Sequence, residues 1–260
     1  MKLDFSKYEG TGNDFIIFDG YHVTNFHINE TIIKKLCDRK YGIGADGLIV
    51  LKKDEKTDFY LDYFNADGSQ SFCGNGSRCG THFALNKNII KKNHTTFAAI
   101  DGIHEAFISH NQVNLKMADV HIFRKNGEHY IIHTGSPHYL EESDDLSTEN
   151  TIQKGRKIRY SKTYESEGIN VNLFRKISNS HAQISTYERG VENETLSCGT
   201  GATACGIALN MLDPSVSKAF IESKGGNLEI SFEYDKKNQI YKQVYLKGSV
   251  NLVFHGTIEI

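Results

Sequence analysis

The stretch Cys73-Gly74-Asn75-Gly76-Ser77-Arg78-Cys79 is nearly repeated, 125 residues further along, as Cys198-Gly199-Thr200-Gly201-Ala202-Thr203-Ala204-Cys205. Each copy puts a cysteine before Gly-x-Gly and a run of small residues that predicts a helix, over 77–85 and 202–211. Unpaired N–H groups and the dipole at a helix N-terminus stabilise a thiolate. The repeat predicts two similar half-chains, each with one reactive cysteine. Such a pair suits an enzyme that removes a proton from one face of a carbon and returns one to the other.

The composition excludes several classes of protein. The chain has 260 residues, 38% of them hydrophobic, which is enough for one globular domain or for two. Its net charge of −2 and its dispersed Lys and Arg argue against nucleic-acid or membrane-surface partners. No apolar run approaches the ~18 residues that span a bilayer. The first residues lack the apolar segment of a secretory signal, so we expect a cytoplasmic protein with reduced thiols.

The order of sequence patterns predicts an α+β fold. In the first half we expect strands at 15–18, 48–51 and 59–64, a helix over 31–40, and an antiparallel meander over 95–132. In the second half we expect a helix over 144–154, strands at 169–174 and 182–188, the second cysteine helix within 199–211, and further strands over the rest of the sequence. The boundary between the halves is predicted near Met117-Ala118.

Two glycine patterns and the remaining cysteines have other interpretations. Gly199–Ala204 and Gly42–Gly47 both fit a dinucleotide-binding pattern, but the second follows a helix and precedes a strand, the reverse of the required order. After the first we expect antiparallel strands rather than a βαβ unit, so we predict no nucleotide site. The cysteine spacings lack the C-x2-C pairs of zinc sites, and no metal is expected. Cys37, Cys79 and Cys205 are interpreted as small buried hydrophobes.

Seven segments, taken in order, resemble the diaminopimelate epimerase family over nearly the whole chain. They are Phe5–Phe15, Gly42–Gly47, Phe64–Gly76, Gly135–His138, Asn170–Asn172, Tyr187–Gly190 and Glu194–Gly201. Related racemases that act on proline or hydroxyproline usually have His where this chain has Asn75, so they match less well.

The resemblance implies a fold of two pseudo-symmetric domains, each a curled mixed or antiparallel sheet around a central helix, with the active site in the cleft between them. In this family the last strand returns to the first domain. We therefore expect one domain from 1–117 together with 249–260, and a second from 118–248. The resemblance also implies a homodimer that needs no cofactor.

The resemblance further implies interconversion of LL- and meso-2,6-diaminopimelate, in lysine and peptidoglycan-precursor biosynthesis. Cys73 and Cys198 would be the two acid/base thiols. The reacting end of the substrate would contact Asn13, Gly74, Asn75, Gly199 and Thr200, and the distal end Asn65, Asn170 and Arg189. Glu188 and His138 would bind substrate and assist proton transfer.

Two positions depart from the family pattern, and two other functions stay open. Ser136 stands where many members have Asn, and Gly47 where some have Gln, which bears on the distal end. A racemase for another amino acid is one alternative. The other is a carboxylate- or nucleotide-binding module whose cysteines sense oxidation. If the proposed pair comes together around substrate, air oxidation should link Cys73 to Cys198 and reversibly abolish activity.

Overall fold

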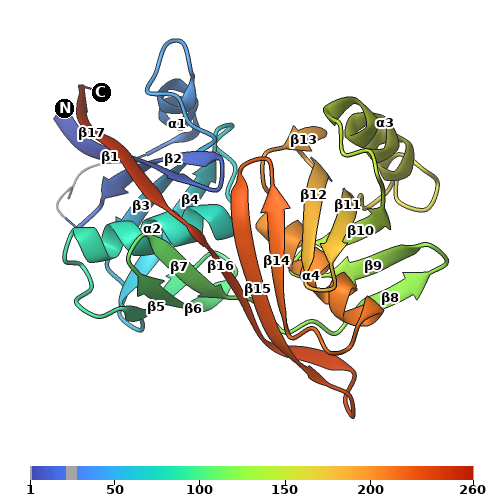
Figure 1. Cartoon of the computed structure of the whole chain (residues 1–260). Coiled ribbons are helices and arrows are strands. Elements are labelled where there is room, and N and C mark those ends of the chain that lie inside the picture. The colour runs from blue at the N-terminus through green and yellow to red at the C-terminus, as the bar shows by residue number, and fades with distance from the viewer. Residues whose placement is uncertain (1, 22–27, 260) are drawn as a thin grey trace. The chain divides into compact units, whose positions relative to one another are not determined.

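The computed structural model describes residues 2–21 and 28–259. It divides into two compact units (Figure 1). The N-terminal unit runs to Leu115 and includes the chain from Gly248 onwards, and the C-terminal unit is Lys116–Lys247. The limits predicted from the sequence, after 117 and after 248, lie within two residues of these.

The N-terminal unit is a mixed sheet with two helices. Its strands are β1 (Lys2–Gly10), β2 (Asn13–Asp19), β3 (Gly47–Lys52), β4 (Phe59–Asn65), β5 (His94–Ala99), β6 (Gly102–Ser109), β7 (Gln112–Lys116) and β17 (Asn251–Glu259). The helices are α1 (Glu30–Cys37) and α2 (Gly74–Asn86). The pairs β2–β3 and β4–β5 are parallel, whereas β17–β1, β1–β2, β3–β4, β5–β6 and β6–β7 are antiparallel.

The C-terminal unit repeats this plan. Its strands are β8 (Phe123–Asn126), β9 (His129–His133), β10 (Pro137–Glu142), β11 (Asn170–Ser178), β12 (His181–Glu188), β13 (Asn193–Thr195), β14 (Lys218–Ser223), β15 (Gly226–Asp235) and β16 (Ile240–Ser249). The helices are α3 (Thr148–Arg159) and α4 (Gly199–Leu212). Here β10–β11 and β12–β14 are parallel, and β8–β9, β9–β10, β11–β12 and β14–β15 are antiparallel.

Each helix in both units connects two parallel neighbouring strands. This holds for α1 between β2 and β3, for α2 between β4 and β5, and for α3 between β10 and β11. In the case of α4, the short strand β13 lies between β12 and the helix, and the parallel pair is β12 and β14. The expectation that no βαβ unit surrounds the second cysteine helix is therefore wrong, because β14 returns parallel to β12. The predicted meander over 95–132 is also two pieces, since β5–β7 belong to the N-terminal unit and β8–β9 to the C-terminal unit.

The cysteine helices α2 and α4 lie at the centre of their units. Helix α2 packs against β1–β4 and β6, and its residues Asn75–Ala84 are all buried. Helix α4 packs against strands of its own sheet, and Gly201–Asn210 are all buried. Runs of Gly, Ala, Ser, Thr and Cys make this possible, because small side chains let strands approach a helix on every side. The prediction of a helix wrapped by a curled mixed sheet is confirmed for both units.

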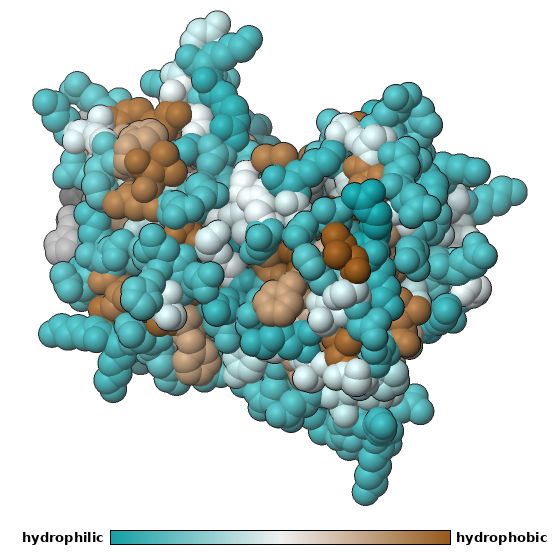
Figure 2. Space-filling model, viewed as in Figure 1, coloured by the Kyte–Doolittle hydropathy of each residue, from teal (hydrophilic) through white to brown (hydrophobic). Residues whose placement is uncertain are grey.

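Strand β17 returns from the end of the chain to pair with β1, from Lys2 opposite Glu259 to Glu9 opposite Asn251. Three consecutive apolar side chains of β17 are largely exposed, with Leu252 at 38%, Val253 at 55% and Phe254 at 46%. Figure 2 shows apolar surface among hydrophilic side chains over the region where Figure 1 draws this strand.

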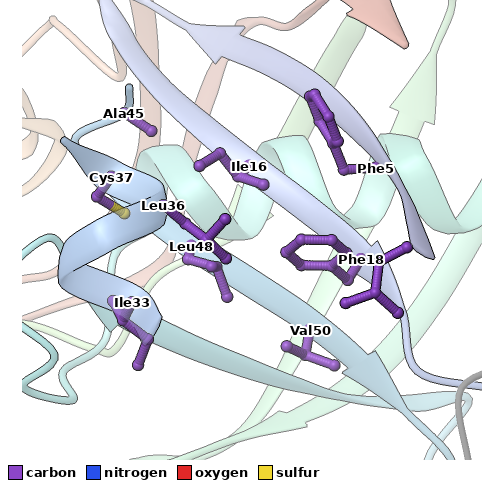
Figure 3. Close-up of a cluster of buried hydrophobic side chains, with 10 residues drawn as sticks. Phe5, Ile16, Phe18, Ile33, Leu36, Cys37, Ala45, Leu48 and Val50 are labelled. Carbon is purple, nitrogen blue, oxygen red and sulfur yellow. The ribbon is translucent and has the colours of Figure 1, made fainter. Parts of the chain in front are cut away.

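A hydrophobic cluster fixes α1 on the N-terminal sheet (Figure 3). Phe5, Ile16, Phe18, Leu48 and Val50 from the strands meet a set from α1 and the loop after it, namely Ile33, Leu36, Cys37 and Ala45. Burial raises the pKa of the Cys37 thiol to about 11, in keeping with its interpretation as a buried hydrophobe.

The two outer helices begin and end at different residues from those predicted. Helix α1 stops at Cys37 rather than at residue 40, because the Asp38 carboxylate accepts the N–H groups of Lys40 and Tyr41 and turns the chain. Helix α3 begins at Thr148 rather than at residue 144. Its N-cap is Ser147, whose hydroxyl accepts the N–H of Asn150 at 3.3 Å.

Candidate active site

Cys73 is the N-cap of α2. Its backbone has φ −127° and ψ 111°, and its Sγ accepts the backbone N–H of Gly76 at 3.4 Å. The helix begins at Gly74, three residues before the predicted start. Glycine disfavours helix interiors, but the first-turn N–H groups have no intrahelical acceptor, so Gly-x-Gly fits there. The thiol and the N–H groups of Gly74 and Asn75 thus share one positive helix end.

Cys198 is the N-cap of α4 in almost the same conformation, with φ −125° and ψ 111°. Its Sγ lies 3.4 Å from the hydroxyl of Thr200, the second residue of the helix. Gly199 and Thr200 occupy the places that Gly74 and Asn75 occupy in α2. The sequence repeat therefore corresponds to one backbone arrangement formed twice.

A Thr-Gly turn contacts the first turn of each cysteine helix, which the sequence analysis missed. In the N-terminal unit, the Thr11 hydroxyl donates to Asn75 Oδ1 at 3.5 Å. In the C-terminal unit, the Thr134 hydroxyl donates to the Thr200 carbonyl at 2.8 Å. Both turns have a glycine with positive φ, 87° at Gly12 and 96° at Gly135. The repeated Thr-Gly pair ahead of each cysteine was the available sequence signal.

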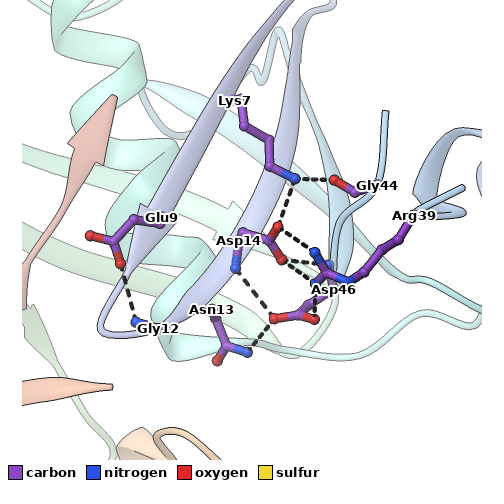
Figure 4. Close-up of polar contacts among 8 residues, drawn as sticks. All are labelled: Lys7, Glu9, Gly12, Asn13, Asp14, Arg39, Gly44 and Asp46. Atoms are coloured by element: carbon purple, nitrogen blue, oxygen red, sulfur yellow. Dashed lines mark hydrogen bonds and ion pairs between the residues drawn. The ribbon is translucent and has the colours of Figure 1, made fainter. Parts of the chain in front are cut away.

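Asn13 is held between Asn75 and a charged cluster. Asn75 Nδ2 donates to Asn13 Oδ1 at 2.5 Å. Asn13 Nδ2 donates to Asp46 Oδ2 of the cluster at 2.9 Å (Figure 4). Arg39 forms ion pairs with both Asp46 and Asp14 at 2.7 Å. This brings the 42–47 loop against β2 and fixes which way the Asn13 amide points.

Lys7 completes that cluster from β1. Its ammonium lies 2.7 Å from Asp14 and also donates to the Gly44 carbonyl. Burial by itself would raise the pKa of Asp14, but hydrogen bonds from Arg39 and Lys7 hold it well below its usual range. Asp14 is therefore ionised at neutral pH and keeps the loop in place.

Asn65 lies at the end of β4 and forms hydrogen bonds within the turn that follows. Its amide nitrogen donates to the hydroxyls of Ser69 at 3.0 Å and Ser71 at 3.2 Å. Its Oδ1 accepts the Tyr63 hydroxyl at 2.9 Å. These contacts are those of a turn former.

Asn170 forms hydrogen bonds with Ser136 and with the backbone of Arg189 in the C-terminal unit. Its amide donates to the Ser136 hydroxyl at 2.8 Å, and its Oδ1 accepts the backbone N–H of Arg189 at 2.9 Å. The Arg189 guanidinium donates to the Glu167 carbonyl at 2.8 Å. Glu188 accepts the Thr195 hydroxyl at 3.0 Å. Asn170, Glu188 and Arg189 therefore lie together at neighbouring strand ends.

His138 is fully buried. Its Nδ1 accepts the Asn172 amide at 3.1 Å, which places the ring proton on Nε2, and Nε2 has no hydrogen-bond partner among the described residues. Burial, followed by the nearby His133 and Arg189, lowers the pKa of His138 to about 3. The imidazole is therefore neutral at physiological pH, so any help it gives to proton transfer comes from the neutral ring.

Asn172, which the sequence analysis did not select, packs closely against Gly201 in the first turn of α4. A Cβ built on Gly201 would lie 2.5 Å from its Oδ1, and that oxygen already accepts the Thr186 hydroxyl at 3.0 Å. A glycine is therefore required at 201 by this close approach.

Across 2–21 and 28–259, no three or more His, Cys, Asp or Glu side chains are grouped so as to hold a metal ion. Within the same residues, no helix combines the length and apolarity needed to cross a bilayer.

Comparison with known proteins places this architecture in a family. The diaminopimelate epimerase family model matches residues 5–122 and 130–253. The diaminopimelate epimerase of Flavobacterium psychrophilum is 47% identical over 99% of this chain and 100% of that protein. The diaminopimelate epimerase of a Hydrogenobaculum species is 38% identical over 97% of each.

Solved structures share the fold at much lower identity. A phenazine biosynthesis protein of the PhzF family from Bacillus anthracis has a TM-score of 0.74 at 13% identity, covering all of both chains. A hydroxyproline epimerase from Agrobacterium vitis has a TM-score of 0.69 at 12% identity, covering 99% of this chain and 92% of that one. The predicted α+β fold class, the predicted isomerase class and the predicted resemblance are confirmed. The chain belongs to the diaminopimelate epimerase family.

Proposed function

We propose that this protein interconverts LL- and meso-2,6-diaminopimelate by two-base proton transfer, with Cys73 and Cys198 as the acid/base thiols. The observation that carries the proposal is the repeated turn: two cysteines of the same chain are N-caps with nearly identical backbone angles on two central helices. Two such thiols match a reaction that exchanges one α-hydrogen between opposite faces of a carbon.

The chemistry needs one thiolate and one thiol at the same α-carbon. The thiolate abstracts the proton from one face, and the thiol donates a proton to the other face. At the end of the reaction the two cysteines have exchanged their protonation states. The reverse reaction restores them. No external electron sink is required if the developing carbanion is stabilised, so we propose that the enzyme works without a cofactor.

That stabilisation is assigned to the helix ends. The carbanion spreads its charge into the α-carboxylate, and the first-turn N–H groups of Gly74, Asn75, Gly199 and Thr200 are the donors proposed to hold it. The Asn13–Asn75 hydrogen bond supports the assignment of both amides to this end of the substrate.

The distal amino-acid end is assigned to Asn65, Asn170 and Arg189. Arg189 is suited to a carboxylate because its guanidinium binds both oxygens at once. Asn170 supports the site by holding the Arg189 backbone, and Ser136 acts on the substrate through Asn170. Glu188 and neutral His138 are proposed to bind substrate and to assist the thiols.

The biological setting is proposed with the reaction. The product serves lysine and peptidoglycan-precursor biosynthesis in the cytoplasm. The functional unit is a homodimer, and the exposed apolar side chains of β17 support pairing with a second copy. Light scattering after size exclusion should give the dimer mass for the wild type and the monomer mass for Phe254→Asp. A monomeric wild type would contradict the dimer.

Solvent exchange tests the reaction directly. In deuterated water, purified enzyme should place deuterium at one α-carbon of diaminopimelate and interconvert the LL and meso forms. Proline and hydroxyproline should stay unlabelled. Labelling of proline instead would replace this proposal with a proline racemase, and tight binding without any labelling would replace it with a binding protein.

A further inference from the structure

Arg78 is a buried cation at the centre of the N-terminal unit. It is the fifth residue of α2, and its side chain is 0% exposed. Its Nε and Nη1 have no hydrogen-bond partner, and it forms no ion pair with any carboxylate of residues 2–21 or 28–259. A buried guanidinium without a counter-ion is costly, so its retention in this place calls for a partner of opposite charge.

The guanidinium points toward the cysteine end of α2. Its Nη2 donates to the Thr11 hydroxyl at 2.7 Å, and that hydroxyl donates to Asn75 Oδ1 at 3.5 Å. Asn75 is only two residues from Cys73. The direction agrees with the general tilt of helical side chains toward the N-terminus. The cation therefore adds to the positive end of the helix that Cys73 caps.

Three acidic groups face Arg78, and they differ in what they can do. Burial lowers the pKa of Arg78, while negative charge on Cys79, Cys73 or Glu9 raises it. Burial also raises the pKa of Cys79 far above its usual range, so Cys79 stays a neutral thiol. Glu9 on β1 accepts the Gly12 N–H at 3.1 Å and the amide of Asn251 at 2.5 Å. Cys73 is left as the group whose charge changes during the proposed reaction.

The C-terminal unit has no such cation. The residue five places after Cys198 is Thr203, also fully buried, and its hydroxyl donates to the Gly199 carbonyl at 2.9 Å. The two cysteine turns therefore have the same backbone conformation, but only the first has a buried cation near it.

We propose that Arg78 is a positioning residue that holds Cys73 as the thiolate of the resting enzyme and leaves Cys198 as the thiol. The proposal rests on the proposed function, because only a two-base enzyme needs its two thiols in opposite states. Through Thr11, the same guanidinium orients Asn75. An α-carboxylate bound at this helix end would meet the same charge.

Alkylation without substrate tests the inference. Iodoacetamide modification of Cys73 and Cys198 is followed by mass spectrometry from pH 5 to pH 10, and the midpoint of each rate profile is compared, because the midpoint does not depend on accessibility. In the wild type the Cys73 midpoint should lie well below that of Cys198, giving at least about tenfold more thiolate at Cys73 near neutral pH. Arg78→Met should raise the Cys73 midpoint, and Arg78→Lys should keep it low.

Thr203→Val is the matched control, because it alters the equivalent site of α4 and should leave the Cys73 midpoint unchanged. Equal midpoints in the wild type would overturn the inference, as would an unchanged Cys73 midpoint in folded Arg78→Met. If circular dichroism shows that Arg78→Met does not fold, the wild-type comparison decides. Solvent exchange on the same samples separates the two proposals: a low Cys73 midpoint without exchange rejects only the function.

Discussion

The turns at Cys73 and Cys198 are copies of one backbone with different surroundings. Their cap angles differ by only 2° in φ, and a Thr-Gly turn contacts each helix start. Yet Cys73 Sγ accepts a helix N–H, whereas Cys198 Sγ lies beside the hydroxyl of Thr200. Five residues after the cysteine, the first helix has the buried Arg78 and the second has Thr203. Duplication has kept the geometry that presents a thiol and has varied the groups that set its charge.

The largest expected effect comes from removing either thiol. Cys73→Ser and Cys198→Ser should each lower kcat by about 10³-fold, since a hydroxyl is a far poorer base than a thiolate and, in the proposed reaction, each thiol serves as base in one direction and acid in the other. Turnover is measured as interconversion of the two diaminopimelate isomers. Cys37→Ala, in the α1 cluster, is the control and should leave turnover unchanged. A wild-type rate in either serine variant would contradict the proposal that both cysteines act in proton transfer.

The third residue of each cysteine helix, Gly76 in α2 and Gly201 in α4, is packed differently in the two units. Gly201→Ala should reduce the free energy of unfolding by about 2 kcal/mol, because the new methyl displaces the buried, hydrogen-bonded Asn172. At the matched position, a Cβ on Gly76 would lie 3.4 Å from Ile49 and Phe15 and 3.5 Å from Cys73, so Gly76→Ala should change the free energy of unfolding by less than about 1 kcal/mol. Urea unfolding measures both. Equal costs at the two glycines would contradict the packing difference.

The strand that follows each Thr-Gly turn carries a different residue four places after the threonine, Phe15 in β2 and His138 in β10. Because the pKa of His138 falls to about 3 in the folded protein, the unfolded chain binds a proton below about pH 6.5 that the folded chain does not. Stability from this group is complete above that pH and declines as pH falls, by up to about 1.4 kcal/mol per pH unit.

Urea unfolding at pH 7.5, 6 and 5 measures this decline. His138→Gln should unfold with a shallower pH dependence than the wild type over the same range. If the two proteins lose stability in parallel on acidification, His138 is not the neutral buried group described above.

The smallest expected effect is at the second residue of α4. Thr200→Val removes the hydroxyl that lies 3.4 Å from Cys198 Sγ and should lower kcat up to about tenfold, the worth of one hydrogen bond. Thr200→Ser retains the hydroxyl and should stay close to the wild type. Turnover that fell equally in both variants would assign the loss to packing instead.

The features that follow from the repeated motif were predicted from the sequence, whereas residues whose roles depend on long-range packing were missed. The paired Cys-Gly-x-Gly motifs led to the two units, their central helices and the family, because that pattern has few physical interpretations. Strands β1 and β10 were not predicted, because motif residues within them interrupt the alternation of polar and apolar side chains that indicates a strand. Helix starts were displaced because first-turn glycines suggest a loop. Thr11 and Asn172 were missed because their roles come from contacts with residues far along the chain.

The pairing of β17 with β1 has a consequence for biosynthesis. The C-terminal unit is contiguous, Lys116–Lys247, and all of it is translated before β17. The N-terminal unit is translated first but is completed last, and until then β1 lacks its neighbour on that edge. A nascent chain therefore keeps a strand edge exposed until β17 has been made, and a truncation that removes β17 harms the unit that was translated first.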